Sequence, residues 1–202
     1  MIFKKGIVLI LLAVVQCSAP DEPEKKKTYF PIDDFSLRTS SIGQKWQGVT
    51  DSVLGNVSTV RLSYNEENGD GYLRIRGHVS MKHRRGFVQC RLYLSPQRDT
   101  VDFSEFTGIR LTARKNKKSS KSGYYVHLRT RRTVFPWSYY YAPFTLTEDW
   151  QVIDIPFDGF SPAGMILKTT LSTEALRSIA LAAVAGKSDS YMDFSVTEIG
   201  FY

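Results

Sequence analysis

Several segments of the sequence place flat aromatic rings beside planar hydrogen-bond donors. The residues concerned, which we call the candidate binding set, are Arg91, Tyr125, His127, Arg129, Trp137, Tyr139 and Tyr141. Sugars stack on tyrosine or tryptophan rings while arginine, glutamine or histidine bonds their hydroxyl groups, and bidentate arginine holds anionic groups. A solvated sheet face, where such side chains merely cover their cross-strand neighbours, is the alternative. We predict that the set borders one concave surface that binds a protein partner or a polar or anionic glycan.

The usual sequence signals of catalysis do not occur in the chain. The three histidines, His78, His83 and His127, are too scattered for an HExxH helix or another zinc site that spacing alone would reveal. There is no G-x-S-x-G elbow, no P-loop and no G-x-G-x-x-G. We therefore expect a protein that is not an enzyme and that uses no cofactor and no metal.

Two acidic stretches could hold a metal or a proton but have simpler interpretations. Asp33 and Asp34 are adjacent, so in a strand they would point to opposite faces. We expect them to be solvated or to contact the first turn. The stretch 65–70 is acid-rich and could bind a structural calcium, but it lacks EF-hand spacing and hairpin turns commonly have this composition.

Alternation of apolar and polar residues runs through most of the chain and predicts strands. The expected strands are 72–80, 87–94, 109–114, 124–129, 139–144, 150–155, 179–184 and 191–201. Their polar phase carries Arg74, Arg76, His78, Gln89 and Tyr93 as well as most of the candidate binding set. Only Thr173–Ser178 is expected to be helical, with Ser172 or Thr173 as its cap. Many short strands and one short helix predict a single domain, residues 29–202, that folds as an all-β, two-sheet antiparallel sandwich.

The first 28 residues differ from the rest in composition. Lys4 and Lys5 precede an apolar run that is too short to span a membrane, so we predict a signal peptide over residues 1–16, with a buried strand as the alternative. Val14-Val15-Gln16-Cys17 resembles a lipobox, and the polar residues 17–28 suit a tether. We expect lipidation at Cys17 and a membrane-anchored lipoprotein of the bacterial cell envelope, with plain secretion as the alternative.

If Cys17 carries a lipid, the role of the second cysteine, Cys90, is affected. Cys90 then has no intrachain partner, and its position on an apolar phase predicts a small core residue.

Removal of residues 1–16 leaves 25 basic and 20 acidic side chains, a net charge of +5. Nine basic residues and no acid lie between Glu105 and Glu148, which predicts one positive region. Nucleic acid could bind such a region, but the predicted export argues against it.

The segment Asp51–Ser58, DSVLGNVS, follows Trp46 and precedes the regular strands. Gly55 and Asn56 tolerate positive φ, and the Asp51 carboxylate can accept hydrogen bonds from loop amides. We predict that Asp51, Gly55 and Asn56 have a structural role in a shaped loop. Direct contact of this loop with a ligand is the alternative.

Five elements in order resemble the complex I intermediate-associated protein 30 family. They are Trp46 with Asp51–Gly55 and Ser58; Gly86-Phe87 with Arg91; Phe103–Leu111; Tyr140, Ala142 and Phe144 with Trp150 and Ile155–Phe157; and Glu198–Tyr202. Leu54 and Asn56 stand where that family usually has methionine and glycine.

The resemblance implies a galactose-binding-like jelly-roll sandwich. It also implies a binding or assembly-factor role, since mitochondrial members are assembly chaperones of the respiratory NADH dehydrogenase. A carbohydrate-binding module of a surface lipoprotein is the alternative function.

Overall fold

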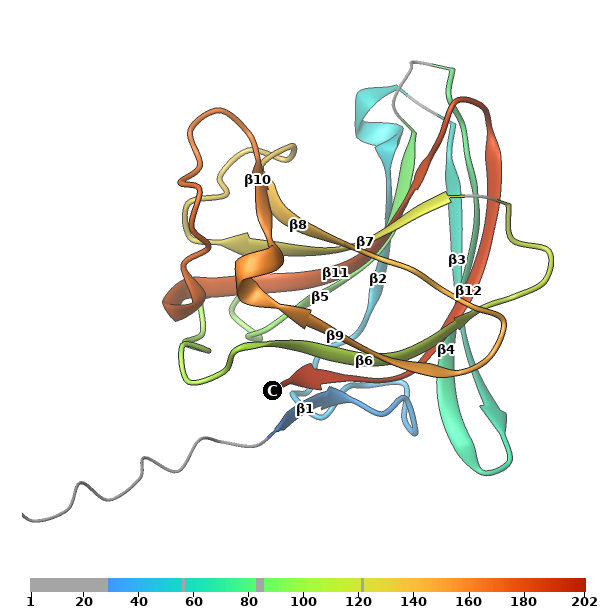
Figure 1. Ribbon diagram of the computed structural model, residues 1–202, viewed down its shortest axis with the longest axis horizontal. Helices are drawn as coiled ribbons and strands as arrows, with labels where there is room; N and C mark the ends of the chain where they lie inside the picture. Colours follow the sequence, from blue (N-terminus) through green and yellow to red (C-terminus); the bar gives the residue numbers. More distant parts are fainter. Residues whose placement is uncertain (1–28, 56, 83–85, 121) are drawn as a thin grey trace, which may run out of the picture.

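The computed structural model describes residues 29–55, 57–82, 86–120 and 122–202. In this part of the chain two six-stranded sheets, in which all pairings are antiparallel, pack face to face as a β-sandwich (Figure 1). The predicted signal peptide, the tether and the lipidation site Cys17 lie outside the described residues. No helix in the described ranges is long and apolar enough to cross a membrane.

Sheet A has the order β3-β4-β12-β6-β9, and β1 also pairs with β12. Its strands are β1 (Phe30–Asp33), β3 (Thr59–Glu67), β4 (Asp70–Val79), β6 (Gly108–Lys115), β9 (Gln151–Pro156) and β12 (Ser190–Phe201). The central strand β12 pairs with β4 through its first half and with β1 through its last residues. Asn68 and Gly69 turn the β3–β4 hairpin with φ of 56° and 91°, the backbone of a two-residue type I′ turn.

Sheet B has the order β10-β8-β7-β11-β5-β2. Its strands are β2 (Gln47–Thr50), β5 (Phe87–Tyr93), β7 (Ser122–Thr130), β8 (Tyr139–Phe144), β10 (Ser161–Ala163) and β11 (Leu176–Ala185). Short 3-10 turns occur at η1 (Asp51–Leu54), η2 (Phe157–Gly159) and η3 (Thr173–Ala175).

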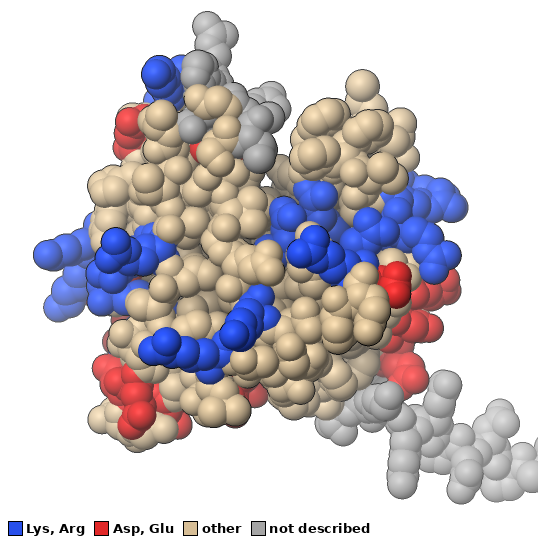
Figure 2. Space-filling view, turned by 180° about the vertical axis from the view of Figure 1, so that it is seen from behind, with Lys and Arg blue, Asp and Glu red and all other residues tan. Residues whose placement is uncertain are grey.

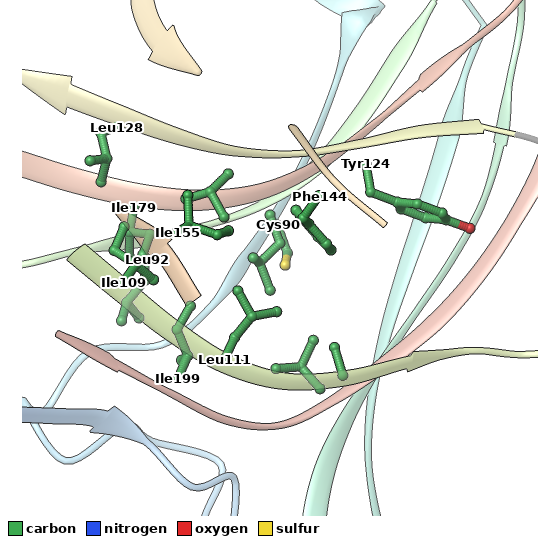
Figure 3. Packing of buried hydrophobic residues seen from close by; sticks show 14 of the residues in the cluster. Cys90, Leu92, Ile109, Leu111, Tyr124, Leu128, Phe144, Ile155, Ile179 and Ile199 are labelled. Carbon is green, nitrogen blue, oxygen red and sulfur yellow. The ribbon is translucent and has the colours of Figure 1, made fainter. Parts of the chain in front are cut away.

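The core lies between the sheets and is built from the apolar phase of the strands. Cys90 and Leu92 of β5 face Ile109 and Leu111 of β6 across it, and all four side chains are fully buried (Figure 3). Burial raises the pKa of the Cys90 thiol to about 12, so this residue is a small, inert core side chain, as expected. The all-β sandwich predicted from the alternation is confirmed.

The predicted helix over Thr173–Ser178 is wrong in extent. Only Thr173–Ala175 form a 3-10 turn, and β11 begins at Leu176. The Leu176 side chain is buried, and its backbone N–H and C=O pair with Val101 at 3.0 and 2.7 Å. Pairing with a distant segment therefore overrides the local helical preference.

The single positive region expected between Glu105 and Glu148 is also wrong. β6 belongs to sheet A and β7 to sheet B, so the basic residues are divided between two faces. On sheet A, Arg110 pairs with Asp154 at 2.6 Å and Arg114 pairs with Glu67 at 2.7 Å. Acids from other parts of the chain thus neutralise charges that have no acid nearby in sequence.

Candidate ligand-binding face

The outward face of sheet B brings most of the candidate binding set together. The strand register places Arg91 of β5 and His127 of β7 on either side of Ala180 of β11, and Tyr141 of β8 beside His127. Tyr125 and Arg129 share the phase of His127, and Tyr139 shares that of Tyr141. The strand phase read from the sequence therefore places these side chains on one face.

The middle strand of this face carries only small side chains. Ser178, Ala180 and Ala182 of β11 point outward and are 1%, 3% and 0% exposed. The strands on either side carry larger residues at the matching positions: Gln89, Arg91 and Tyr93 on β5, and Tyr125, His127 and Arg129 on β7. Small residues thus lie between two rows of larger side chains that cover them almost completely, and we call this strip of sheet B the sheet B groove. The space-filling view is hollowed between a lobe on the β8–β10 side and a lobe on the η1 side, with basic side chains gathered beside the hollow (Figure 2).

One wall of the sheet B groove is aromatic. His127 and Tyr139 stack with ring centroids 4.2 Å apart and planes 20° apart. Tyr125 and Tyr141 meet edge to face at 5.9 Å, and Tyr141 contacts Tyr139 in the same way at 6.3 Å. These rings contact one another in an unbroken row along β7 and β8.

The turn between β7 and β8 closes one end of this wall. Arg129 donates hydrogen bonds to the carbonyl oxygens of Phe135, at 3.3 Å, and Pro136. The rings of Phe135 and Trp137 stack 5.2 Å apart and remain 43% and 60% exposed. Trp137 therefore belongs to a turn that is held against the face by Arg129. Arg129 has a structural contact as well as an outward position, which the sequence pattern did not reveal.

The electrostatics of the face are set by arginines without acids. Burial, together with the charges of Arg129 and Arg91, lowers the pKa of His127 to about 3, so its imidazole is neutral at physiological pH. Burial and the Arg91 charge lower the pKa of Arg129 to about 10, which still leaves it protonated. Neither Arg91 nor Arg129 forms an ion pair with a carboxylate of the described residues.

Three other outward residues predicted from the same pattern lie on a different face, whereas Gln89 and Tyr93 lie on β5 with Arg91. Arg74, Arg76 and His78 belong to β4, in sheet A. Arg74 is paired bidentately with the buried Asp193 at 2.8 and 2.6 Å. The groove floor and Phe135 were missed by the sequence reasoning, although the small residues at every second position of 178–182 are a usable signal.

The loop before β3 is linked to β5 through Asp51. The Asp51 carboxylate is buried and accepts hydrogen bonds from the Ser58 hydroxyl at 2.9 Å and the Phe87 amide at 3.1 Å. Gly55 has φ of +80°, as predicted, and Asn56 lies outside the described residues. The geometry of Asp51 and Gly55 is that of a built turn that anchors β5.

Asp33 and Asp34 accept hydrogen bonds from neighbouring groups of the fold. Asp33 is buried and accepts hydrogen bonds from the Trp46 indole and the Phe35 amide, both at 2.8 Å, so it contacts the first turn and is not solvated. Asp34 accepts from the amide and hydroxyl of Ser36. Within the described ranges, no three histidine, cysteine or acidic side chains lie close enough together to hold a metal ion.

These features define the molecule as a galactose-binding-like β-sandwich with a groove on one sheet. Residues 35–196 match the family described as complex I intermediate-associated protein 30 (CIA30), and the chain belongs to that family. The resemblance read from its motifs is therefore confirmed. A comparison with curated proteins found no match.

Solved structures of similar fold include modules that bind carbohydrate. The family 11 carbohydrate-binding module from Clostridium thermocellum, solved with a β-1,3-1,4-mixed-linked tetrasaccharide, has a TM-score of 0.64 and 16% identity over 86% of this chain and 94% of that one. A family 30 carbohydrate-binding module has a TM-score of 0.51 and 14% identity over 72% and 91% of the two chains. At these identities the likeness shows the fold alone.

Proposed function

We propose that this protein is a non-catalytic binding domain and that the sheet B groove binds a glycan chain. The observation that carries the proposal is the small floor, Ser178 to Ala182, between an aromatic wall and a row of hydrogen-bonding side chains. Five strand residues span about 13 Å from first to last, which is the length of a short oligosaccharide rather than of a single small molecule. Gln89 also faces the groove, and its side-chain amide makes no hydrogen bond to another described residue, so it is available to a ligand hydroxyl.

The chemistry of the two walls suits sugars. The apolar faces of pyranose rings stack on flat aromatic rings such as Tyr139 and Tyr141, while guanidinium and amide groups bond the hydroxyl groups at the ring edge. The Clostridium thermocellum module that shares this fold was solved with a tetrasaccharide, and this supports the same class of ligand here.

A second candidate function is the binding of a protein partner, as in assembly factors. Membership of the CIA30 family favours it. The exposed apolar side chains of Val134, Phe135 and Trp137, in the turn at the end of the groove, are the observation that supports it, since such clusters commonly mark interfaces. Export to the bacterial cell envelope and a lipid anchor at Cys17 are part of our proposal for either function.

Thermal denaturation in the presence of soluble glycans tests the first function. A ligand that binds only the native state stabilises it by about 2.7 kcal/mol at a hundredfold excess over Kd, which raises Tm by several degrees. Tyr139→Ala removes a ring of the groove wall and should abolish this rise. Arg129→Ala with Tyr139→Ala should do so too, but Arg129 also holds the β7–β8 turn, so the single variant is the cleaner test.

Tyr191→Ala is the matched control. Tyr191 also contacts a histidine, His78, with centroids 5.0 Å apart, but it lies on sheet A. It should keep the full response to glycan. If Tyr139→Ala folds and responds like the wild type, the groove is not the glycan site. If no glycan of a broad panel raises Tm, the glycan function is wrong and the protein-partner function takes its place.

A further inference from the structure

The sheet B groove holds two arginines whose charges no carboxylate of the described residues compensates. On sheet A, Arg74, Arg110 and Arg114 are each paired with a carboxylate at 2.6 to 2.7 Å, whereas Arg61 and Arg76 have no ion pair among the described residues. On sheet B, Arg91 makes no side-chain hydrogen bond or ion pair with the described residues, and Arg129 donates only to backbone carbonyl groups. We infer that the groove selects acidic sugar chains and that Arg91 and Arg129 hold a carboxylate or sulfate group of the ligand; this rests on the proposed glycan-binding function.

The positions of the two arginines suit a single anion between them. Arg91 lies beside Ala180, and Arg129 lies beside Ser178 on the other side of the same strand. Neighbouring strands are about 4.8 Å apart and the offset along the strand is two residues, so the two Cα atoms are separated by about 12 Å. Both arginine charges lower the pKa of His127, so both guanidinium groups lie near its imidazole, and Arg129 keeps its bonds to the β7–β8 turn. The oxyanion of the ligand would bind Arg91 and the remaining N–H groups of Arg129 at this point.

The charges around this space repel one another. Arg129 is half-buried, and its pKa is lowered by burial first and then by Arg91, with a further contribution from Arg177. His127 faces the same space from β7 and is held neutral, with Tyr93, Tyr139 and Tyr141 as the other titratable neighbours on β5 and β8. An oxyanion at this point would relieve the repulsion between the arginines and form charge-assisted hydrogen bonds, which are about twice as strong as neutral ones. A neutral sugar would leave the repulsion in place.

The aromatic wall argues for a sugar rather than an acidic peptide as the carrier of the anion. The partly exposed rings of Tyr125, Tyr139 and Tyr141 present aromatic surface beside the arginines, and His127 is stacked on Tyr139. Sugar rings use such a surface, whereas acidic side chains do not. Polyglutamate therefore serves as the competing probe.

The experiment compares polymers that differ in charge but not in backbone. Polygalacturonate is compared with its fully methyl-esterified form, and dextran sulfate with dextran, by isothermal titration calorimetry at low salt. We expect the charged member of at least one pair to bind at least tenfold more tightly than its neutral partner, and which pair responds identifies carboxylate or sulfate. Because exposed charge interactions are screened, the preference should shrink as salt is raised.

Arg91→Gln should reduce affinity for the charged polymer roughly 10- to 100-fold, the loss expected for one charged hydrogen-bonded contact. Arg61→Gln removes the same charge from an exposed position on β3 of sheet A and should change the affinity less than threefold. Both variants are first checked for wild-type Tm. The Arg91 side chain has no hydrogen-bond partner among the described residues, so its replacement should leave the fold intact.

Four results would overturn the inference. Equal binding of charged and neutral polymers would mean that the groove recognises sugar but not charge, and the proposed function would stand. An equal loss in Arg61→Gln would mean that general surface charge attracts the polymer. Tighter binding of polyglutamate would identify an acidic peptide as the ligand. Failure of every charged and neutral polymer to bind would overturn the inference and the proposed function together.

Discussion

The neutral, buried His127 should make the stability of the domain depend on pH in a way that can be calculated. Its ordinary pKa of 6.5 applies in the unfolded chain, whereas burial and the nearby Arg129 and Arg91 lower the folded-state pKa to about 3. Between these values the unfolded chain binds a proton that the folded domain does not. Stability must therefore fall as pH drops below 6.5, and this loss levels off near pH 3.

Between pH 5 and pH 7.5, the contribution of His127 to the free energy of unfolding depends only on the pKa of its imidazole in the unfolded chain. At pH 5, about 1.5 units below the pKa of the unfolded imidazole, protonation stabilises the unfolded chain by roughly 2 kcal/mol. At pH 7.5 the same effect is about 0.1 kcal/mol or less. The folded imidazole remains neutral at both values. His127 should thus account for about 2 kcal/mol of the stability lost between pH 7.5 and pH 5.

Urea denaturation at the two pH values, on wild type and His127→Phe, measures this contribution. Phenylalanine keeps a ring against Tyr139, which stacks on His127 at 4.2 Å, and cannot titrate. The variant should show about 2 kcal/mol less pH dependence than the wild type. His78→Phe, which removes an exposed histidine on sheet A, is the control and should retain the wild-type difference. The same pH dependence in wild type and His127→Phe would show that His127 is hydrated or charged in the folded protein.

Three further predictions concern the loops and the N-terminus. Gly55→Val should destabilise the domain by about 1–2 kcal/mol in urea denaturation, because φ of Gly55 is +80°. The site has open space around it, so the cost is conformational, and Gly55→Asn should cost less. Wild-type stability of Gly55→Val would contradict this prediction. Trp46→Phe should cost about 1–3 kcal/mol because it removes the indole donor of the buried Asp33, and an unchanged urea midpoint would mean that this bond contributes nothing. Mass spectrometry of the mature protein from native membranes should find a lipidated Cys17 at the N-terminus, and an unmodified N-terminus downstream of it would exclude the anchor.

The side-chain phase of single strands could be predicted from the sequence. Alternation within 87–94, 124–129 and 139–144 is a local property, and it correctly placed Arg91, His127 and Tyr139 away from the core. The same alternation in 72–80 placed Arg74 and Arg76 outward as well, but on the other sheet. Phase says which side of a strand a residue occupies, whereas the neighbours of that strand are decided by pairing between distant segments.

The features that the sequence did not reveal have one local cause and one non-local cause. Strands β1 and β10 are short edge segments that contain Pro31 and Pro162, and proline weakens the alternating signal. The groove floor exists only because β11 lies between β5 and β7, so Ala180 gained its role from two strands that are far away in sequence. The partners that neutralise Arg110 and Arg114, Asp154 and Glu67, are likewise 44 and 47 positions away.

The long central strand β12 has a consequence for the rate at which this domain folds. Phe30 of β1 pairs with Phe201 of β12, and β4 and β6 flank the same strand, so sheet A cannot close until segments about 170 residues apart have met. Two-state domains with such distant pairings fold in milliseconds to seconds rather than microseconds. Until β12 is in place, the inner edges of β4 and β6 have unpaired backbone groups and exposed apolar residues, a state that is prone to aggregation. Refolding should therefore be slow, and the yield of native protein should fall as the protein concentration during refolding is raised.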